Sequence, residues 1–145
     1  MSTKQNKELV HKNWEDWNSI AGDVTKVRSV FDKYHATNYI SHDLSKGDKN
    51  YEQQIEYFGT MVSAFPDMKI SIDDMVAEGD EVAYRYTIQA THKGTFMGIP
   101  ATGKQAAVKG VEIYKIQGRK IIEGWIIPDY LGMMTQLGVI PSPKT

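Results

Sequence analysis

The segment from Val108 to Tyr130, VKGVEIYKIQGRKIIEGWIIPDY, constrains the fold more than any other part of the sequence. It contains two β-rich runs separated by Gln117-Gly118, then Pro128-Asp129 and the start of a helix. A short loop with glycine between two such runs is typical of a β-hairpin. We therefore build the interpretation around this predicted hairpin.

The register of the hairpin predicts part of a cavity wall. With a Gln117-Gly118 loop, Gly110 lies opposite Trp125 and leaves room for its indole, while Glu112 lies opposite Glu123. Facing carboxylates are unfavourable on an ordinary surface, so either the register differs or one acid is kept protonated in a site. By the alternation of strand side chains, one face of the second strand then carries Glu123, Trp125, Ile127 and Asp129. A tryptophan flanked by acids on one face suggests a cavity.

Composition favours one globular domain over residues 1–145. The chain has 145 residues, 17 basic and 18 acidic, so no charge bias indicates nucleic acid or an anionic membrane as a partner. Without cysteine there is no disulfide framework, and the N-terminus lacks an apolar signal core, so we expect a cytoplasmic protein. The four histidines have no metal-ligand spacing and no dinucleotide fingerprint is present, so we expect neither a metal nor a cofactor.

Helical periodicity comes first along the chain and strand periodicity follows. The sequence predicts helices over residues 3–20, after Asp23, over 51–65 and over 130–137, with an extended dipeptide or two and then a polar loop at 36–50. It predicts strands over 69–78 and 81–91, joined by Gly79-Asp80, and a long loop over 92–104. This order favours an α+β fold with helices on one face of a curved sheet.

Both faces of the predicted sheet carry apolar residues. One face has Val82, Tyr84, Tyr86 and Ile88, and the other has Ile70, Ile72 and Val76. Helices of a single domain cover only one face, and large exposed apolar patches are uncommon on monomers. We therefore expect a homodimer formed through the outer sheet face.

Several segments, in order, resemble the SnoaL-like polyketide cyclase family of the NTF2-like superfamily, which includes proteins called ester cyclases. They are NYISHD, AFPDMKI, AEGDEVAYRYTIQATHKGTFMGIPATGK and GRKIIEGWIIPDYLGMMTQLG, and the resemblance covers about residues 8–138. It implies a cone-shaped α+β barrel, with a curved antiparallel sheet packed on three N-terminal helices around a deep, mostly apolar cavity. Characterised relatives close a ring by intramolecular aldol condensation, using an aspartate as acid and base and no cofactor.

Asp129 matches the family's acid/base aspartate, which follows a tryptophan that is here Trp125. A carboxylate in an apolar cavity suits proton transfer next to a carbonyl, but Asp129 follows a proline and could instead cap the last helix. His42 and His92 fall in predicted loops, where they either polarise a substrate carbonyl or are ordinary surface residues. Many relatives carry a histidine where this chain has Gly124, which weakens any claim that the substrate is shared.

Other residues are expected to form the pocket: Trp125, Glu123, Glu112, Trp17, Tyr39 and Phe96. Arg85 is explained by a cross-strand ion pair with Asp74. The hypothesis is a polyketide (ester) cyclase acting on a small apolar carbonyl compound. The alternatives are a ketosteroid-isomerase-like isomerase, a dehydratase with a buried His–Asp pair, or a non-catalytic binding protein in which Asp129 only caps a helix.

Overall fold

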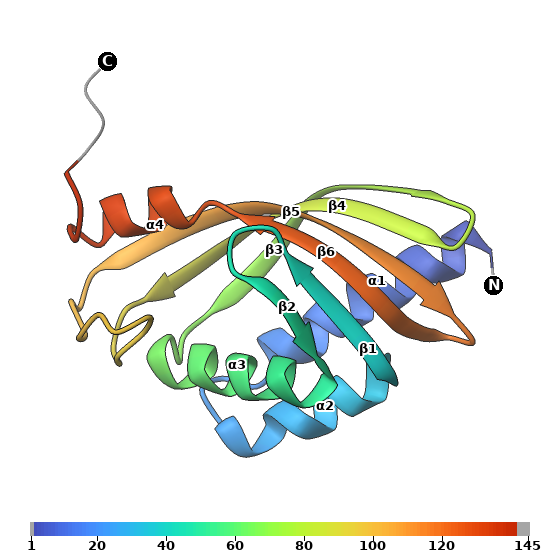
Figure 1. Cartoon of the computed structure of the whole chain (residues 1–145), viewed down its shortest axis with the longest axis horizontal. Helices are drawn as coiled ribbons and strands as arrows, with labels where there is room; N and C mark the ends of the chain where they lie inside the picture. The colour runs from blue at the N-terminus through green and yellow to red at the C-terminus, as the bar shows by residue number, and fades with distance from the viewer. Residues whose placement is uncertain (1, 142–145) are drawn as a thin grey trace.

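A computed structural model describes residues 2–141 of the chain. Its helices are α1 (Thr3–Asn18), the 3₁₀ turn η1 (Val24–Lys26), α2 (Val27–Tyr34), α3 (Tyr51–Ala64) and α4 (Tyr130–Gln136). Its strands are β1 (His35–Asp43), β2 (Gly47–Asn50), β3 (Lys69–Glu78), β4 (Glu81–Thr91), β5 (Gln105–Gln117) and β6 (Lys120–Pro128). The sheet curves over α1, α2 and α3, while α4 lies beyond one end of it (Figure 1). The expected α+β fold is confirmed, with the sheet left open.

The six strands lie in the order β2-β1-β6-β5-β4-β3. Four of the five neighbouring pairs are antiparallel, as expected for the curved sheet, and only β1 and β6 pair in parallel. Residues 35–43 and 47–50 form two strands, where only an extended dipeptide or two and then a polar loop were predicted. β1 pairs with β6, the last strand of the chain. A pattern of neighbouring residues cannot predict a pairing between segments so far apart in the sequence.

Local signals set the helix starts. Ser2 caps α1 and Asn50 caps α3, each with a glutamine three residues on, Gln5 and Gln53, that completes a capping box. The apolar faces of these helices pack on the sheet and form the main core with residues such as Trp14, Phe31, Phe58, Tyr84 and Tyr114. None of the helices among residues 2–141 is both long and apolar enough to cross a membrane.

A bulge in β3 changes the predicted faces of that strand. Ile70 pairs with Ile88 and Ile72 pairs with Tyr86, so Ile70 and Ile72 point to the helix side of the sheet, not the outer side as predicted. The register shifts between Ile72 and Asp74, and this extra residue turns Val76 outward, where 63% of it is exposed. The outer face is therefore less apolar than the alternation predicted.

The β5–β6 hairpin differs from its prediction in the turn and in the register. Gly118 and Arg119, both with positive φ, form the turn, and a bulge lies between Ile121 and Glu123. As a result, Glu112 faces Ile126 and Gly110 faces Pro128, and the predicted Glu112–Glu123 pair does not form.

Candidate functional site

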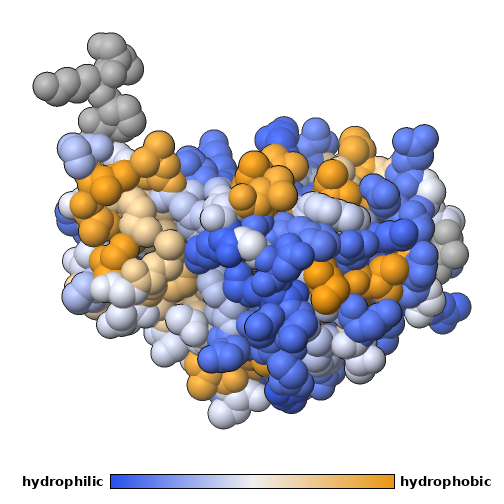
Figure 2. Space-filling view, viewed as in Figure 1, coloured by the Kyte–Doolittle hydropathy of each residue, from blue (hydrophilic) through white to orange (hydrophobic). Residues whose placement is uncertain are grey.

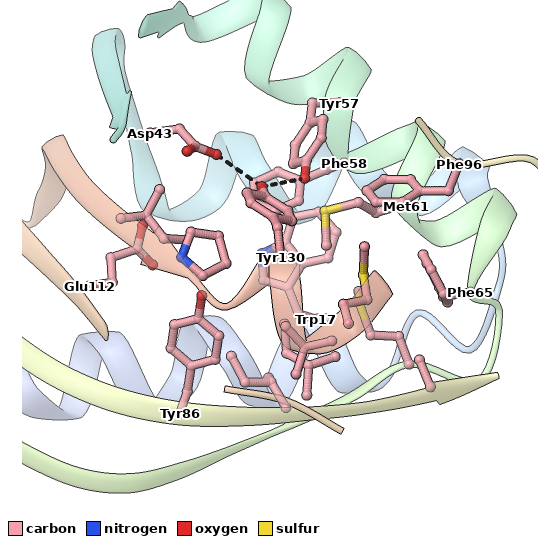
Figure 3. A pocket seen from close by; sticks show the side chains of 18 of the residues that line it. Trp17, Asp43, Tyr57, Phe58, Met61, Phe65, Tyr86, Phe96, Glu112 and Tyr130 are labelled. Carbon is pink, nitrogen blue, oxygen red and sulfur yellow. Dashed lines mark hydrogen bonds between the residues drawn. The ribbon is translucent and has the colours of Figure 1, made fainter. Parts of the chain in front are cut away.

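A cavity lies between the curved sheet and helices α1, α3 and α4, with a volume of about 90 Å³. Most of its wall is apolar and includes Trp17, Phe58, Met61, Phe65 and Phe96 (Figure 3). Ile126 also lines it. A small number of polar side chains interrupt this wall, among them Asp43, Lys49, Tyr57, Tyr86, Glu112 and Tyr130. An apolar pocket with a few convergent polar groups is typical of a small-molecule site.

Glu112 is the acid on the sheet side of this cavity. It lies on the inner face of β5 and only 4% of it is exposed. Its carboxyl accepts a hydrogen bond from the Tyr84 hydroxyl, which in turn accepts one from the Trp14 indole N–H at 3.0 Å. Burial raises the pKa of Glu112 to about 8, although hydrogen bonds from Tyr84 and Tyr114 act in the opposite direction. At neutral pH this carboxyl is therefore largely protonated and can donate a proton into the cavity.

Tyr86 projects into the cavity from β4, close to Glu112 (Figure 3). Its ring crosses over Gly110 on β5, where an added Cβ would lie 2.3 Å from the Tyr86 hydroxyl oxygen. A side chain at position 110 would thus displace the phenol, so Gly110 gives Tyr86 its orientation. Burial, followed by the charge of Glu112, raises the pKa of Tyr86, which keeps it a neutral hydrogen-bond donor.

A chain of hydrogen bonds forms the opposite wall (Figure 3). The Tyr130 hydroxyl donates to Asp43 Oδ2 at 2.9 Å and lies 3.0 Å from the Tyr57 hydroxyl, which accepts from Lys46 Nζ at 3.1 Å. Asp43 Oδ1 accepts from the backbone N–H groups of Ser45 and Lys46, at 2.8 and 3.1 Å. Burial raises the pKa of Tyr57 to about 12 and lowers that of Lys46 to about 8. The cavity therefore has an acid and a phenol on one wall and an oriented carboxylate on the other.

Three of the residues predicted for the site line this cavity: Glu112, Trp17 and Phe96. Three others meet on the opposite, outer face of the sheet. There His42 stacks on Trp125 with ring centroids 5.4 Å apart, and its Nε2 lies 2.7 Å from Glu123 Oε2. The prediction that Trp125 and Glu123 form the cavity wall was wrong, because the bulge after Ile121 turns both side chains outward.

The other predicted residues lie elsewhere. Asp129 is exposed and its carboxylate accepts the Gly132 N–H at 2.8 Å, so it caps α4 and does not line the cavity. His92 is fully buried at the base of the 92–104 loop, where the Thr102 N–H donates to its Nδ1. Tyr39 belongs to the core and packs edge-on against Phe31.

These placements bear on the dehydratase alternative. The ring nitrogens of His42 contact Asp48 and Glu123. Among residues 2–141, the ring nitrogens of His92 form hydrogen bonds only with Thr102. Asp129 therefore pairs with neither histidine. In the same part of the chain, histidine and carboxylate side chains form no group of three that could hold a metal ion.

The sequence reasoning missed the polar side chains Asp43, Lys46, Tyr57, Tyr86 and Tyr130 as site residues. Asp43 directly follows His42 in NYISHD, and the alternation of a strand places the two on opposite faces. Recognising 35–43 as a strand would have assigned Asp43 to the inside. Gly110, which was matched with the wrong aromatic residue, was the signal for Tyr86.

The sequence profile of SnoaL-like polyketide cyclases matches residues 12–137. The chain belongs to this family. Its NTF2-like fold is shared with the proposed hydroxylase AclR from Streptomyces galilaeus, which is 24% identical, with a TM-score of 0.86 over 99% of this chain and 87% of AclR. A proposed polyketide cyclase from Acidithiobacillus ferrooxidans is 32% identical, with a TM-score of 0.76 over 96% of this chain and 99% of its own.

IdmH from Streptomyces antibioticus, also a proposed polyketide cyclase, is 26% identical, with a TM-score of 0.78 over 92% of this chain and 99% of IdmH. No curated protein is similar enough in sequence to match. The similarity thus establishes the family and the fold of this SnoaL-like protein. Its reaction has to be argued from the side chains of its own cavity.

Proposed function

We propose that this SnoaL-like protein catalyses a cyclase-type acid–base reaction, an intramolecular aldol ring closure on an apolar carbonyl compound. The observation that carries the proposal is Glu112, a buried carboxyl that is largely protonated at neutral pH and lines the cavity beside Tyr86. A neutral acid and a phenol that donate hydrogen bonds to one oxygen stabilise the negative charge that develops there.

In this reaction Asp43 takes the proton from the carbon next to a carbonyl, while Glu112 and Tyr86 donate hydrogen bonds to the carbonyl oxygen as it becomes an enolate. The enolate carbon then attacks a second carbonyl carbon of the same molecule and forms the ring bond. The protonated Asp43 returns its proton to the new alkoxide, so the enzyme ends unchanged. Asp43 is suited to this role because it lines the cavity and is oriented by Tyr130 and by two backbone N–H groups. Asp129, exposed and engaged with α4, takes no part in it.

Deuterium exchange at the methyl group of acetophenone in D₂O, followed by NMR, tests the proposal without knowledge of the natural substrate. We expect Glu112→Gln to slow enzyme-dependent exchange by about 10²-fold or more, because an amide is a much weaker hydrogen-bond donor to the developing enolate oxygen than a protonated carboxyl. Asp43→Asn should abolish exchange, and Asp129→Asn should retain it. Glu123→Gln is the matched control, since it makes the same substitution on the outer face of the sheet.

Full exchange by Glu112→Gln, together with loss in Asp129→Asn, would reassign the acid/base role to Asp129. If the wild-type protein bound the ketone without any exchange, the proposal would fail, and the protein would be better described as a small-molecule binder. Circular dichroism of each variant separates loss of exchange from loss of folding.

A further inference from the structure

Two lysines lie beside the polar wall of the cavity, with Asp43 as the nearby carboxylate. Lys46 lies in the β1–β2 turn, and Lys49 lies on β2 opposite Ser41, which also lines the cavity. Neither lysine forms an ion pair in the described part of the chain. Both ammonium groups stand over the same ring, that of Tyr57, at 4.6 and 4.7 Å from its centroid. Two unpaired cations are therefore held together beside an apolar cavity.

The nearest acidic residues are engaged elsewhere. Asp43 is buried, and both of its oxygens accept hydrogen bonds, from two backbone N–H groups and from Tyr130. Asp48 alternates with Lys49 along β2, so it points to the outer face of the sheet and contacts His42 at 2.9 Å. Two lysines and one nearby aspartate leave one formal positive charge uncompensated at the mouth.

The ammonium group of Lys46 is surrounded by aromatic rings, unlike that of an ordinary surface lysine. Its ammonium lies 4.3 Å from the ring centroid of Tyr130 and 5.1 Å from that of Phe96, in addition to Tyr57. Partial burial lowers its pKa to about 8; the charge of Asp43 acts in the opposite direction, and the smaller effect of Lys49 adds to the lowering. A lysine that only covers apolar surface with its stem leaves its head in water. Here the head is partly desolvated beside a second cation, an arrangement that an incoming anion would stabilise.

We propose that Lys46 and Lys49 bind the carboxylate of a ligand whose apolar, carbonyl-bearing body fills the cavity, so that the ligand is a free acid and not an ester. The single uncompensated charge matches a carboxylate better than a phosphate dianion. Figure 2 shows hydrophilic surface over the β1–β2 hairpin next to apolar surface at the α4 end, as expected for an entrance that receives an amphipathic molecule. This inference rests on the proposed function for the cavity and the carbonyl, but it concerns binding, and the two can fail separately.

Isothermal titration with 4-oxo-4-phenylbutanoate and with its methyl ester tests the inference at pH 7. The two probes share the ketone and the ring and differ only in the negative charge. We expect the wild-type protein to bind the acid about tenfold or more tightly than the ester, the size typical of a charge-assisted hydrogen bond. In Lys46→Met and Lys49→Met, the preference for the acid should fall several-fold, while the affinity for the ester stays close to that of the wild type. Lys109→Met, which removes an exposed lysine from β5, is the matched control and should behave as the wild type.

Equal affinities for acid and ester in the wild type, or a preference that survives in both lysine variants, would overturn the inference. A third probe, 3-phenylpropyl phosphate, tests the choice of anion, and tighter binding of the phosphate than of the acid would overturn the assignment to a carboxylate. If a lysine variant fails to fold, salt provides the second measurement on the wild type. Raising the ionic strength should weaken binding of the acid and leave that of the ester unchanged, because ions screen only the charged probe. Deuterium exchange is measured separately. If the protein prefers the acid but does not catalyse exchange, the carboxylate site stands and the proposed reaction fails.

Discussion

The two faces of the β5–β6 hairpin each present a glutamate beside aromatic side chains, yet the two glutamates differ in burial and in protonation. On the inner face, Glu112 is 4% exposed and touches buried tyrosines. On the outer face, the Glu123 side chain is 32% exposed, and it accepts a hydrogen bond from His42, whose pKa it raises. Burial turns the first glutamate into a neutral acid, whereas water and a histidine make the second part of a surface ion pair.

This difference teaches that residue type and spacing do not show which acid faces the cavity. Glu123 and Trp125 on β6 were predicted to line the cavity. One extra residue after Ile121 instead turns both side chains to the outer face of the sheet.

The largest effect should come from a charge on the outer face, where we still expect a homodimer to form. Val111 on β5 and Val24 in η1 are both 48% exposed, so Val111→Glu and Val24→Glu are matched substitutions. A charge buried in an interface costs about 2–5 kcal/mol, so Val111→Glu should raise the dimer dissociation constant by roughly 10²-fold or more. Val24→Glu should leave it unchanged. Light scattering after size exclusion measures both, and a wild-type monomer at every concentration would remove the interface altogether.

A steric change on the inner face should come next. A Cβ at Gly124 would lie 2.8 Å from the Tyr39 hydroxyl and 3.1 Å from the Tyr114 ring, both in the core. Gly124→Val should therefore destabilise the fold by about 1–3 kcal/mol, the usual cost of overpacking. Ile127→Val on the exposed side of the same strand should cost no more than about 0.5 kcal/mol. Urea unfolding compares the two, and equal costs would contradict the assignment of the faces.

The protonation of Glu112 should appear in the pH dependence of stability. Its pKa is about 8 in the folded protein against 4.5 ordinarily, so the folded state binds this proton more tightly than the unfolded chain. Its contribution is complete below pH 4.5 and is lost as the pH rises toward 8. As the pH rises from 4.5 to 8, the unfolding free energy of the wild type should therefore fall relative to that of Glu112→Gln. The same comparison with Glu123→Gln should show a loss only as the pH rises above 6.5, where His42 loses its proton. A Glu112 difference that stays flat from pH 4.5 to 6.5 would mean that this acid is already ionised in the folded protein there.

Removing the Asp129 cap of α4 should have a moderate effect on stability. Asp129→Ala removes the acceptor for the Gly132 N–H and should cost about 1 kcal/mol of stability, whereas Asp129→Ser should retain most of it. Thermal unfolding measures this. Normal stability in the alanine variant with lost deuterium exchange would return Asp129 to a catalytic role.

The smallest effect should be a change in one pKa on the outer face. Hydrogen bonds from His42 to Glu123 and to Asp48 raise the pKa of His42 above 6.5. Glu123→Gln should move it down toward 6.5 without changing ketone exchange, and NMR titration of the imidazole measures the shift. A drop in exchange would indicate that the outer cluster acts on the cavity.

Features of this protein that depend on neighbouring residues were predictable from the sequence. The capping residues Ser2 and Asn50, the Gly79-Asp80 turn and the strands on either side of it all arise from contacts within a few positions. The motifs spread along the chain also identified the family correctly, because their order does not depend on packing.

Which side chains face the cavity could be decided only by the tertiary structure. The bulges in β3 and β6 are single-residue shifts against a partner strand, and the β1–β6 pair joins the beginning of the sheet to its end. Glu112 becomes an acid because Tyr84 and the helices bury it, and Tyr86 reaches the cavity because Gly110 lies beneath its ring. Burial is a property of segments that meet in space, so the chemistry of this site emerges only after the chain has folded.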